Sequence, residues 1–306
     1  EGRAVVVEVL PGSPAAQAGV KPGWELVRVK GQDVAPLFAK LDAAFQVSTQ
    51  RDLILTRRIQ GLLDGALEEA VEADFHDGTK RVQVQLRRVE PRGRMLTFGN
   101  MPPTAFWLER KALPEGIRYL RFSLWMDPEA VAEAFRASLR EGGPVRGFVL
   151  DLRGNPGGIG GMAMGAAGWF TDRTDRKLGT MVLRGSSLKF IVNPRPEPFQ
   201  GPLAILVDGC SGSTSEIFAG GMQDLKRARV FGSRSAGAAL PSVFERLPNG
   251  DGFQFAIANY VSDGGQPLEG RGVTPDEPVP LTRSALLAGR DPVLDRAIAW
   301  ITASTR

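Results

Sequence analysis

Apolar and polar positions follow two different periods along the chain, and these periods predict where strands and helices lie. Two nearly continuous apolar runs, Gly147 to Arg153 (GFVLDLR) and Pro202 to Asp208 (PLAILVD), are typical of strands buried on both faces. Helical stretches are expected around them, at Pro128 to Arg140, Gly160 to Phe170 and Glu216 to Arg227. Strands that alternate with helices predict an α/β core in which both faces of the sheet are covered.

The first 90 residues predict shorter strands and helices than the rest of the chain. A β-branched strand is expected at Ala4 to Val9, a short capped helix follows it, and Arg81 to Arg88 (RVQVQLRR) alternates as a strand. We therefore expect a small β-rich domain over residues 1–90 and a connector rich in Pro and Gly over 91–116. The α/β core, with a C-terminal packing helix, is expected over 117–306.

Composition excludes several classes of function. The 306 residues carry 38 basic and 34 acidic side chains without a concentrated basic block, so no nucleic-acid surface is expected. One cysteine, Cys210, and one histidine, His76, exclude a disulfide framework and metal sites built from several Cys or His, and no cofactor is expected. The longest small-apolar run, Gly161 to Phe170, is about half the length of a membrane span. Because the chain opens at Glu1 without an initiator Met, we expect a fragment or a processed form.

A serine in a strand–turn–helix segment is the sharpest candidate for chemistry. Ser213 follows the apolar strand in GCSGSTSEIF, where the N–H groups and the positive end of a helix dipole would stabilise an oxyanion. The same serine stands three residues before Glu216, which is the spacing of a capping box. The hydroxyl is therefore either a nucleophile or a helix cap, and the spacing alone favours the cap.

A glycine-rich turn follows the other apolar strand, in DLRGNPGG. Gly157 and Gly158 would let a ligand approach the backbone and leave N–H groups free. The segment is neither a Walker A loop nor a dinucleotide-binding fingerprint, so nucleotide binding is not indicated. Asp151 and Arg153, which flank the turn, are expected to form an internal ion pair that anchors it.

Five segments stand in one order along the chain: SPAAQAGVKPG, DLRGNPGG, SGSTSEIFAGGMQD, VFGSRSAGA and LEGRGVTPD. In this ordered set the chain resembles the C-terminal processing (tail-specific) serine peptidases. The resemblance implies a PDZ-like domain on an α/β core of the crotonase-like type and endoproteolysis of unfolded or extended polypeptides. It also implies a periplasmic, cell-envelope or secreted location, and it leaves open whether the chain forms a homo-oligomer.

The resemblance also assigns roles to single residues. The nucleophile of the family falls on Ser213, and the oxyanion donors would be the backbone N–H of Thr214 and of Gly157 or Gly158. Supporting polar positions fall on the following residues: Glu216, Asp224, Ser235 and, in LEGRGVTPD, Glu269.

The proton acceptor of the family is missing. The lysine of the Ser–Lys dyad would fall on Ala238, and the histidine of the branch that resembles the tricorn core would fall on Arg121. Neither residue can take a proton from a serine. Three explanations stay open: an engineered change from lysine, a loss of catalysis that leaves a polypeptide-binding scaffold, or a base supplied by Glu216, Glu269, Lys226 or Lys189.

Overall fold

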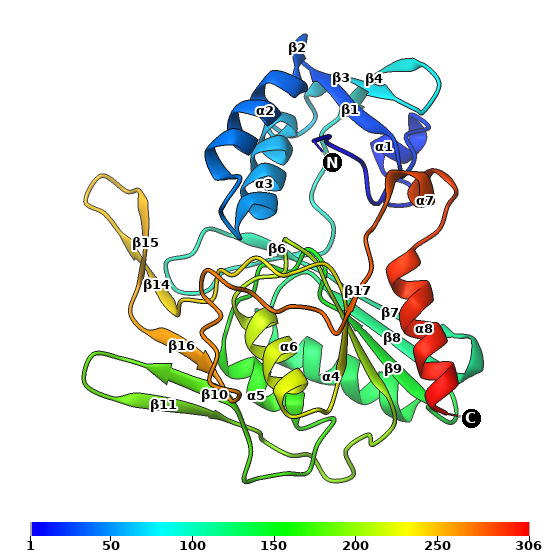
Figure 1. Cartoon of the computed structure of the whole chain (residues 1–306). Coiled ribbons are helices and arrows are strands. Elements are labelled where there is room, and N and C mark those ends of the chain that lie inside the picture. Colours follow the sequence, from blue (N-terminus) through cyan, green and yellow to red (C-terminus); the bar gives the residue numbers. More distant parts are fainter. Residues whose placement is uncertain (1, 306) are drawn as a thin grey trace. The chain divides into compact units, whose positions relative to one another are not determined.

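The computed structural model describes residues 2–305. Its contacts divide the chain into two compact units (Figure 1). Unit 1 comprises the chain up to Pro91 together with Pro280–Asp295, and unit 2 comprises Arg92–Val279 together with the chain from Arg296 on. No helix within residues 2–305 is long and apolar enough to cross a bilayer.

Unit 1 has a four-stranded antiparallel sheet in the order β2-β1-β3-β4. Its strands are β1 Glu25–Val29, β2 Gln32–Asp33, β3 Ala70–His76 and β4 Arg81–Arg87. Its helices are α1 Pro14–Gln17, α2 Val34–Phe45, α3 Arg51–Leu63 and α7 Arg283–Leu287. Ser13 caps α1 by accepting a hydrogen bond from the N–H of Ala16, and β4 covers the predicted alternating strand, so both predictions are confirmed.

The strand predicted at Ala4 to Val9 is wrong. The segment makes an isolated bridge from Val5 to Glu25 and three backbone hydrogen bonds of 2.8 Å, in which Val6 bonds to Gly23 and Trp24 and the carbonyl oxygen of Ala4 accepts from Leu26. Strand β1 already pairs with β3 along one edge and with β2 at Arg28 and Val29. Only the start of the second edge is therefore open, which is too short for a regular ladder.

Unit 2 is built on a six-stranded sheet in the order β17-β13-β12-β9-β8-β7. The strands are β7 Leu108–Leu113, β8 Ile117–Phe122, β9 Gly147–Asp151, β12 Leu203–Val207, β13 Arg229–Gly232 and β17 Glu277–Pro278. All neighbours are parallel except β7, which pairs antiparallel with β8. This parallel sheet with helical crossovers is the mixed α/β fold that the alternating pattern predicts.

Helices cover both faces of this sheet. The helices are α4 Pro128–Arg140, α5 Gly161–Ala167, α6 Thr214–Asp224 and α8 Pro292–Ser304. On β9, Phe148 stacks on Phe135 of α4 at 5.9 Å, whereas a Cβ at Gly147 would lie 2.1 Å from the Ile301 side chain of α8. Because neighbouring strand residues point to opposite faces, α4 and α8 lie on opposite sides of the sheet.

The rest of unit 2 consists of small antiparallel elements. The segment 91–116, expected as a connector, contains β5 Arg94–Leu96, β6 Thr104–Phe106 and β7, followed by the 3-10 turn η1 Pro114–Gly116. Another sheet joins β10 Lys177–Val182 to β11 Ser187–Ile191 and β16 Asn259–Ser262. A hairpin of β14 Ser242–Arg246 and β15 Gly252–Ala256 extends away from the main sheet (Figure 1).

Candidate active site

Two adjacent strands of the main sheet bring the candidate segments together. Strands β9 and β12 are parallel neighbours in which Asp151 lies opposite Leu206. Their carboxyl ends therefore meet at one edge of the sheet, and the glycine-rich turn and the serine turn both begin there. This edge is where parallel α/β sheets place their ligands.

Hydrogen bonds join the two turns directly. The carbonyl oxygen of Asn155 accepts from the N–H of Gly212 and from the hydroxyl of Ser215, each at 3.0 Å. The hydroxyl of Thr214 donates to the carbonyl oxygen of Gly158 at 2.9 Å. The backbone of one turn is thus held against the first turn of α6 by three bonds.

Gly157 is the point of closest approach between the turns. Its φ is +106°, and a Cβ built on it would lie 2.6 Å from the Cβ of Ser213 and 3.0 Å from the nitrogen of Thr214. A side chain has neither the backbone conformation nor the space at this position. Glycine here therefore lets the loop touch the candidate nucleophile.

Ser213 itself has a strained backbone. Its φ of 51° and ψ of −116° lie outside the usual regions for a residue with a side chain. Such strain is concentrated at functional sites, and a sharp strand-to-helix turn of this kind exposes a nucleophilic serine in other hydrolase folds. The side chain is half-buried, so it is not sealed inside the core.

Ser213 and Glu216 form a capping box with unequal halves. The N–H of Ser213 donates to Glu216 Oε2 at 2.9 Å. The reciprocal half, from the N–H of Glu216 to the Ser213 side chain, is also present but lacks the geometry of a full hydrogen bond. The same N–H donates to the Ser213 carbonyl oxygen at 2.9 Å. The carboxylate therefore makes the stronger half of the cap, and the Ser213 hydroxyl takes part only as an acceptor, so the cap does not use its proton.

Two backbone amides beside Ser213 are open. The N–H of Gly157 donates to Asn155 Oδ1 at 3.0 Å, so this expected oxyanion donor is already engaged. Across the described part of the chain, no protein group accepts a hydrogen bond from the N–H of Gly158 or of Thr214. The geometry thus leaves Gly158 and Thr214, of the three expected donors, to bind an anion.

The Glu216 carboxylate binds both Ser213 and the segment from Ser235 to Ala238. It is fully buried and accepts four hydrogen bonds, from the N–H of Ser213, Gly237 and Ala238 and from the Ser235 hydroxyl, at 2.6–3.0 Å. Burial raises its pKa above the usual range, and the hydrogen bonds from Ser235, Gly237, Ala238 and Ser213 oppose that rise. Each oxygen accepts twice, so all four lone-pair positions of the carboxylate are occupied.

Ala238 lies directly beside the candidate nucleophile. Its carbonyl oxygen accepts from the N–H of Ser213 at 3.0 Å, and its own N–H donates to Glu216. Glu269 supports the same segment by accepting from the N–H of Ala239 at 2.7 Å and of Leu240 at 3.1 Å. Ser235, expected as a supporting residue, contacts Glu216 and also accepts from the N–H of Val273 at 2.6 Å.

Asp224 is not brought to the site. It ends α6, ten residues beyond Thr214, which is about 15 Å along a helix. Its carboxylate accepts from the N–H of Gly264 at 2.8 Å and so anchors a turn. Lys226 follows it, still farther along the chain from Ser213.

One candidate base, Lys189, and two other basic residues, His76 and Arg121, complete the comparison. Lys189 lies on β11 and is exposed. His76 is in unit 1, where its Nδ1 accepts from the N–H of Gly78 at 3.2 Å. Arg121 lies on β8 with its guanidinium 5.2 Å from the ring centre of Trp107. Among residues 2–305, no lysine or histidine forms a hydrogen bond with the Ser213 hydroxyl.

The expected ion pair beside the glycine turn is present. Arg153 donates to both carboxylate oxygens of the fully buried Asp151, and the Tyr119 hydroxyl donates to Asp151 Oδ2 at 2.9 Å. Burial raises the pKa of Asp151, but the charge and hydrogen bonds of Arg153 outweigh it and hold that pKa below its usual range. The start of the loop is thereby anchored to the sheet.

Two residues support the site in ways that the sequence analysis did not assign to them. Asn155 engages the N–H of Gly157 through its side chain and donates to Phe122 O at 2.9 Å. Trp125 is fully buried and donates its indole N–H to the Ser215 hydroxyl at 2.9 Å. An Asn two residues before a glycine is a signal for such a side-chain turn, whereas the Trp125–Ser215 contact spans 90 positions and has no local signature.

No metal site accompanies this arrangement: within residues 2–305, no group of three or more His, Cys, Asp or Glu side chains is placed to hold an ion. The model of peptidase family S41 matches residues 116–279, which include both turns and the segment around Ala238. The chain belongs to peptidase family S41. The match covers more than half of the chain and all of the site described above.

Known relatives of this S41 chain are processing peptidases. It is 29% identical over 281 residues to the chloroplastic C-terminal processing peptidase of Tetradesmus obliquus, which covers 89% of this chain and 56% of that protein. It is 26% identical over 284 residues to the carboxyl-terminal-processing protease of Synechocystis sp., covering 90% and 58%. The chain thus spans somewhat more than half the length of these curated relatives.

Solved structures share the fold. The photosystem II D1 C-terminal processing protease aligns with a TM-score of 0.56 at 23% identity, covering 94% of this chain and 73% of that one. Mature CPAF complexed with lactacystin aligns with a TM-score of 0.64 at 13% identity, covering 98% and 80%. At these identities the likeness concerns the fold alone.

Proposed function

We propose that the chain is a serine endopeptidase of the C-terminal processing type, which cleaves loosely folded or extended polypeptides through an acyl-enzyme. One observation carries the proposal. Ser213, on a strained turn, lies against the glycine loop at Gly157, and the amides of the residues that follow each of them, Gly158 and Thr214, are open. Membership of peptidase family S41 supports it independently.

The chemistry follows from that arrangement. Ser213 Oγ attacks the carbonyl carbon of a peptide bond, a C–O bond forms, and the carbonyl oxygen becomes an oxyanion. The N–H groups of Gly158 and Thr214 donate hydrogen bonds to this oxygen. Such stabilisation of the oxyanion is usually the largest single contribution to the rate of acyl transfer. Collapse of the intermediate breaks the C–N bond, and the amine leaves with a proton. Water then hydrolyses the ester and returns the proton to Ser213.

The group that takes the proton from Ser213 is the open part of the mechanism. Glu216 already accepts four hydrogen bonds, so it would have to release one of them before it could act as the base. We propose that it is a positioning residue instead. Glu269, Lys226 and Lys189 stay as candidates supplied by rearrangement, and Ala238 occupies the position where the family has its lysine.

A second function is favoured by that same alanine. A chain with an intact oxyanion site but no base would bind extended polypeptide as an adaptor or scaffold. The observation in its favour is that position 238, in backbone contact with Ser213, carries a methyl group rather than an amine.

Further features of the proposal concern the whole protein. We propose that unit 1 is a PDZ-like domain and that unit 2 is a core of the crotonase-like type. We also propose a periplasmic, cell-envelope or secreted location. Relatives in bacteria and chloroplasts support it.

The test is degradation of casein, a disordered protein, by the parent chain and by Ser213→Ala and Ala238→Lys. Cleavage that is lost in Ser213→Ala establishes a peptidase with an unusual base. No cleavage by the parent but cleavage by Ala238→Lys establishes a site that lacks only its proton acceptor. If all three are silent while Ser213→Ala still binds casein, the scaffold function replaces the enzymatic one.

A further inference from the structure

An apolar groove begins beside the glycine loop of unit 2. It has a volume of about 310 Å³ and lies between α4 and α5. Its apolar lining comes from these residues: Val131, Phe135, Ile159, Met162, Ala166 and Trp169. Glycines at 161 and 165 leave α5 without side chains on part of this wall. The volume is in the range of small-ligand pockets and accommodates one large aliphatic or aromatic side chain.

Ile159 links the groove to the candidate active site. It follows Gly158 directly, and its N–H donates to Trp125 O at 2.6 Å. Two residues of chain reach at most about 7 Å, so Ile159 lies within that distance of Gly157. A polypeptide whose carbonyl sits at Ser213 can therefore place a nearby side chain in the groove.

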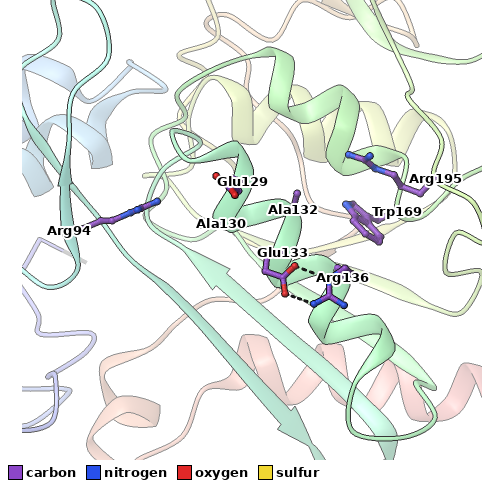
Figure 2. A pocket seen from close by; sticks show the side chains of 8 residues that line it. All are labelled: Arg94, Glu129, Ala130, Ala132, Glu133, Arg136, Trp169 and Arg195. Atoms are coloured by element: carbon purple, nitrogen blue, oxygen red, sulfur yellow. Dashed lines mark hydrogen bonds and ion pairs between the residues drawn. The ribbon is translucent and has the colours of Figure 1, made fainter.

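Arg195 is a cation that lines the groove. Arg195 lies with its guanidinium 5.4 Å from the ring centre of Trp169, and Figure 2 shows the two side chains next to each other. Within the described residues, Arg195 has no carboxylate partner. The other arginines of this region do: Arg136 pairs with Glu133, and Arg94 with Asp127.

The hollow continues past Arg195. A second cavity of about 820 Å³ shares Ala132, Trp169 and Arg195 with the groove and extends along α4 to Arg94 (Figure 2). A bound chain is therefore not forced to end at Arg195. This continuity favours an acidic side chain, rather than a terminal carboxylate, as the partner of the guanidinium.

We propose that the groove between α4 and α5 is a binding site for extended polypeptide in which an apolar side chain fills the space between the helices and a neighbouring Asp or Glu pairs with Arg195. Arg195 stacks on Trp169 and so presents its planar N–H donors to a carboxylate with little loss of side-chain freedom. The inference names substrate features for the proposed peptidase and in that respect rests on the proposed function.

Binding, rather than cleavage, tests the site. Fluorescein-labelled Gly-Ser-Leu-Asp-Ser-Gly with an amidated end is titrated into Ser213→Ala by fluorescence polarisation, beside the same peptide with Asn for Asp. We expect Asp→Asn in the peptide, or Arg195→Gln in the protein, to weaken binding about tenfold, and the two changes together to add little more. Arg140→Gln, which removes an equal charge outside the groove, serves as the control.

A second experiment fills the groove. Ala132 is a half-buried residue of α4 that lines the groove, and Ala132→Phe should weaken binding of the Leu peptide about tenfold. Binding of the same peptide with Ser in place of Leu should not change. Thermal unfolding of each variant shows that the fold is retained.

Three outcomes overturn the inference. The first is equal binding of the Asp and Asn peptides, and the second is an Arg195→Gln effect no larger than that of Arg140→Gln. The third is an Asn peptide with a free carboxyl end that binds as tightly as the amidated Asp peptide. Because the assay uses a chain without the nucleophile, it answers even if casein cleavage is absent. Cleavage of casein without peptide selectivity would overturn the groove alone.

Discussion

The contact between Gly157 and Ser213 yields the sharpest prediction. Gly157→Ala adds one methyl group 2.6 Å from the Cβ of Ser213, 2.9 Å from Gly212 O and 3.0 Å from the nitrogen of Thr214, at a φ of +106°. Gly154→Ala is the matched control. It lies in the same loop with a φ of +74°, and nothing lies within 4 Å of its added Cβ.

The expected losses of stability follow from the room that each added methyl group has. The positive φ alone costs an alanine about 1–2 kcal/mol, and both variants carry this cost. The crowded methyl group of Gly157→Ala adds about 1–3 kcal/mol, because backbone atoms surround it. For a unit of about 200 residues this extra cost lowers Tm by about 2–12 °C relative to Gly154→Ala.

Activity should separate the two variants further. Relief of the contact moves the loop away from Ser213 and takes the Gly158 amide with it, so we expect about a hundredfold loss of casein cleavage in Gly157→Ala. Gly154→Ala should stay within a fewfold of the parent. The measurements are thermal unfolding and initial rates on casein for both proteins. Equal Tm values for the two variants would refute the close approach between the loop and Ser213, whatever the rates.

Other predictions concern buried polar groups and one turn. Glu216→Gln places an amide NH₂ against two buried N–H donors, so urea unfolding should show a loss of about 2–4 kcal/mol, whereas the exposed Glu133→Gln should show a much smaller loss. Arg227 donates to three backbone carbonyl oxygens, and burial lowers its pKa to about 10, so Arg227→Met should cost about 2–4 kcal/mol by the same measurement. A hydrogen bond from the N–H of Lys80, with others in the same turn, lowers the pKa of Asp77 to about 2. Its contribution is therefore present above its usual value of 3.8 and is lost as the pH falls to about 2, and carbon-13 NMR titration with Asp77→Asn as reference checks this.

The sequence was most informative where one strand or one turn decides the outcome. The apolar runs that became β9 and β12 place two turns at one sheet edge, and that edge is the site. Strands rich in polar residues were harder to predict from the sequence. The segment LERKAL of β7 is rich in charged residues because it pairs at the edge of the sheet, so it carries no apolar alternation.

Contacts between residues that are far apart in the sequence could not be predicted from the pattern of apolar and polar positions. Nothing near Arg283 indicates that its guanidinium donates to the carbonyl oxygens of Gly23 and His76, both at 2.9 Å, within unit 1. Asp224, which the resemblance gave as a supporting residue, is instead separated from Ser213 by the length of α6. A helix carries a residue about 1.5 Å away for each position, so an acid eleven residues after Ser213 belongs to the other end of α6.

The two interpretations of Ser213, as a cap and as a nucleophile, are not exclusive. A capping box pairs two backbone N–H groups with two side-chain acceptors, and in this protein Glu216 supplies the stronger one, to the N–H of Ser213. The Ser213 hydroxyl only accepts in the weaker half, so its proton stays available, at a residue whose φ and ψ are strained and beside a loop that only glycine can form. The same carboxylate accepts from the N–H of Ala238 and so holds position 238 in place beside Ser213. In the proposed function this is the position of the family's lysine, which is why Ala238→Lys is the most direct test of the proposal.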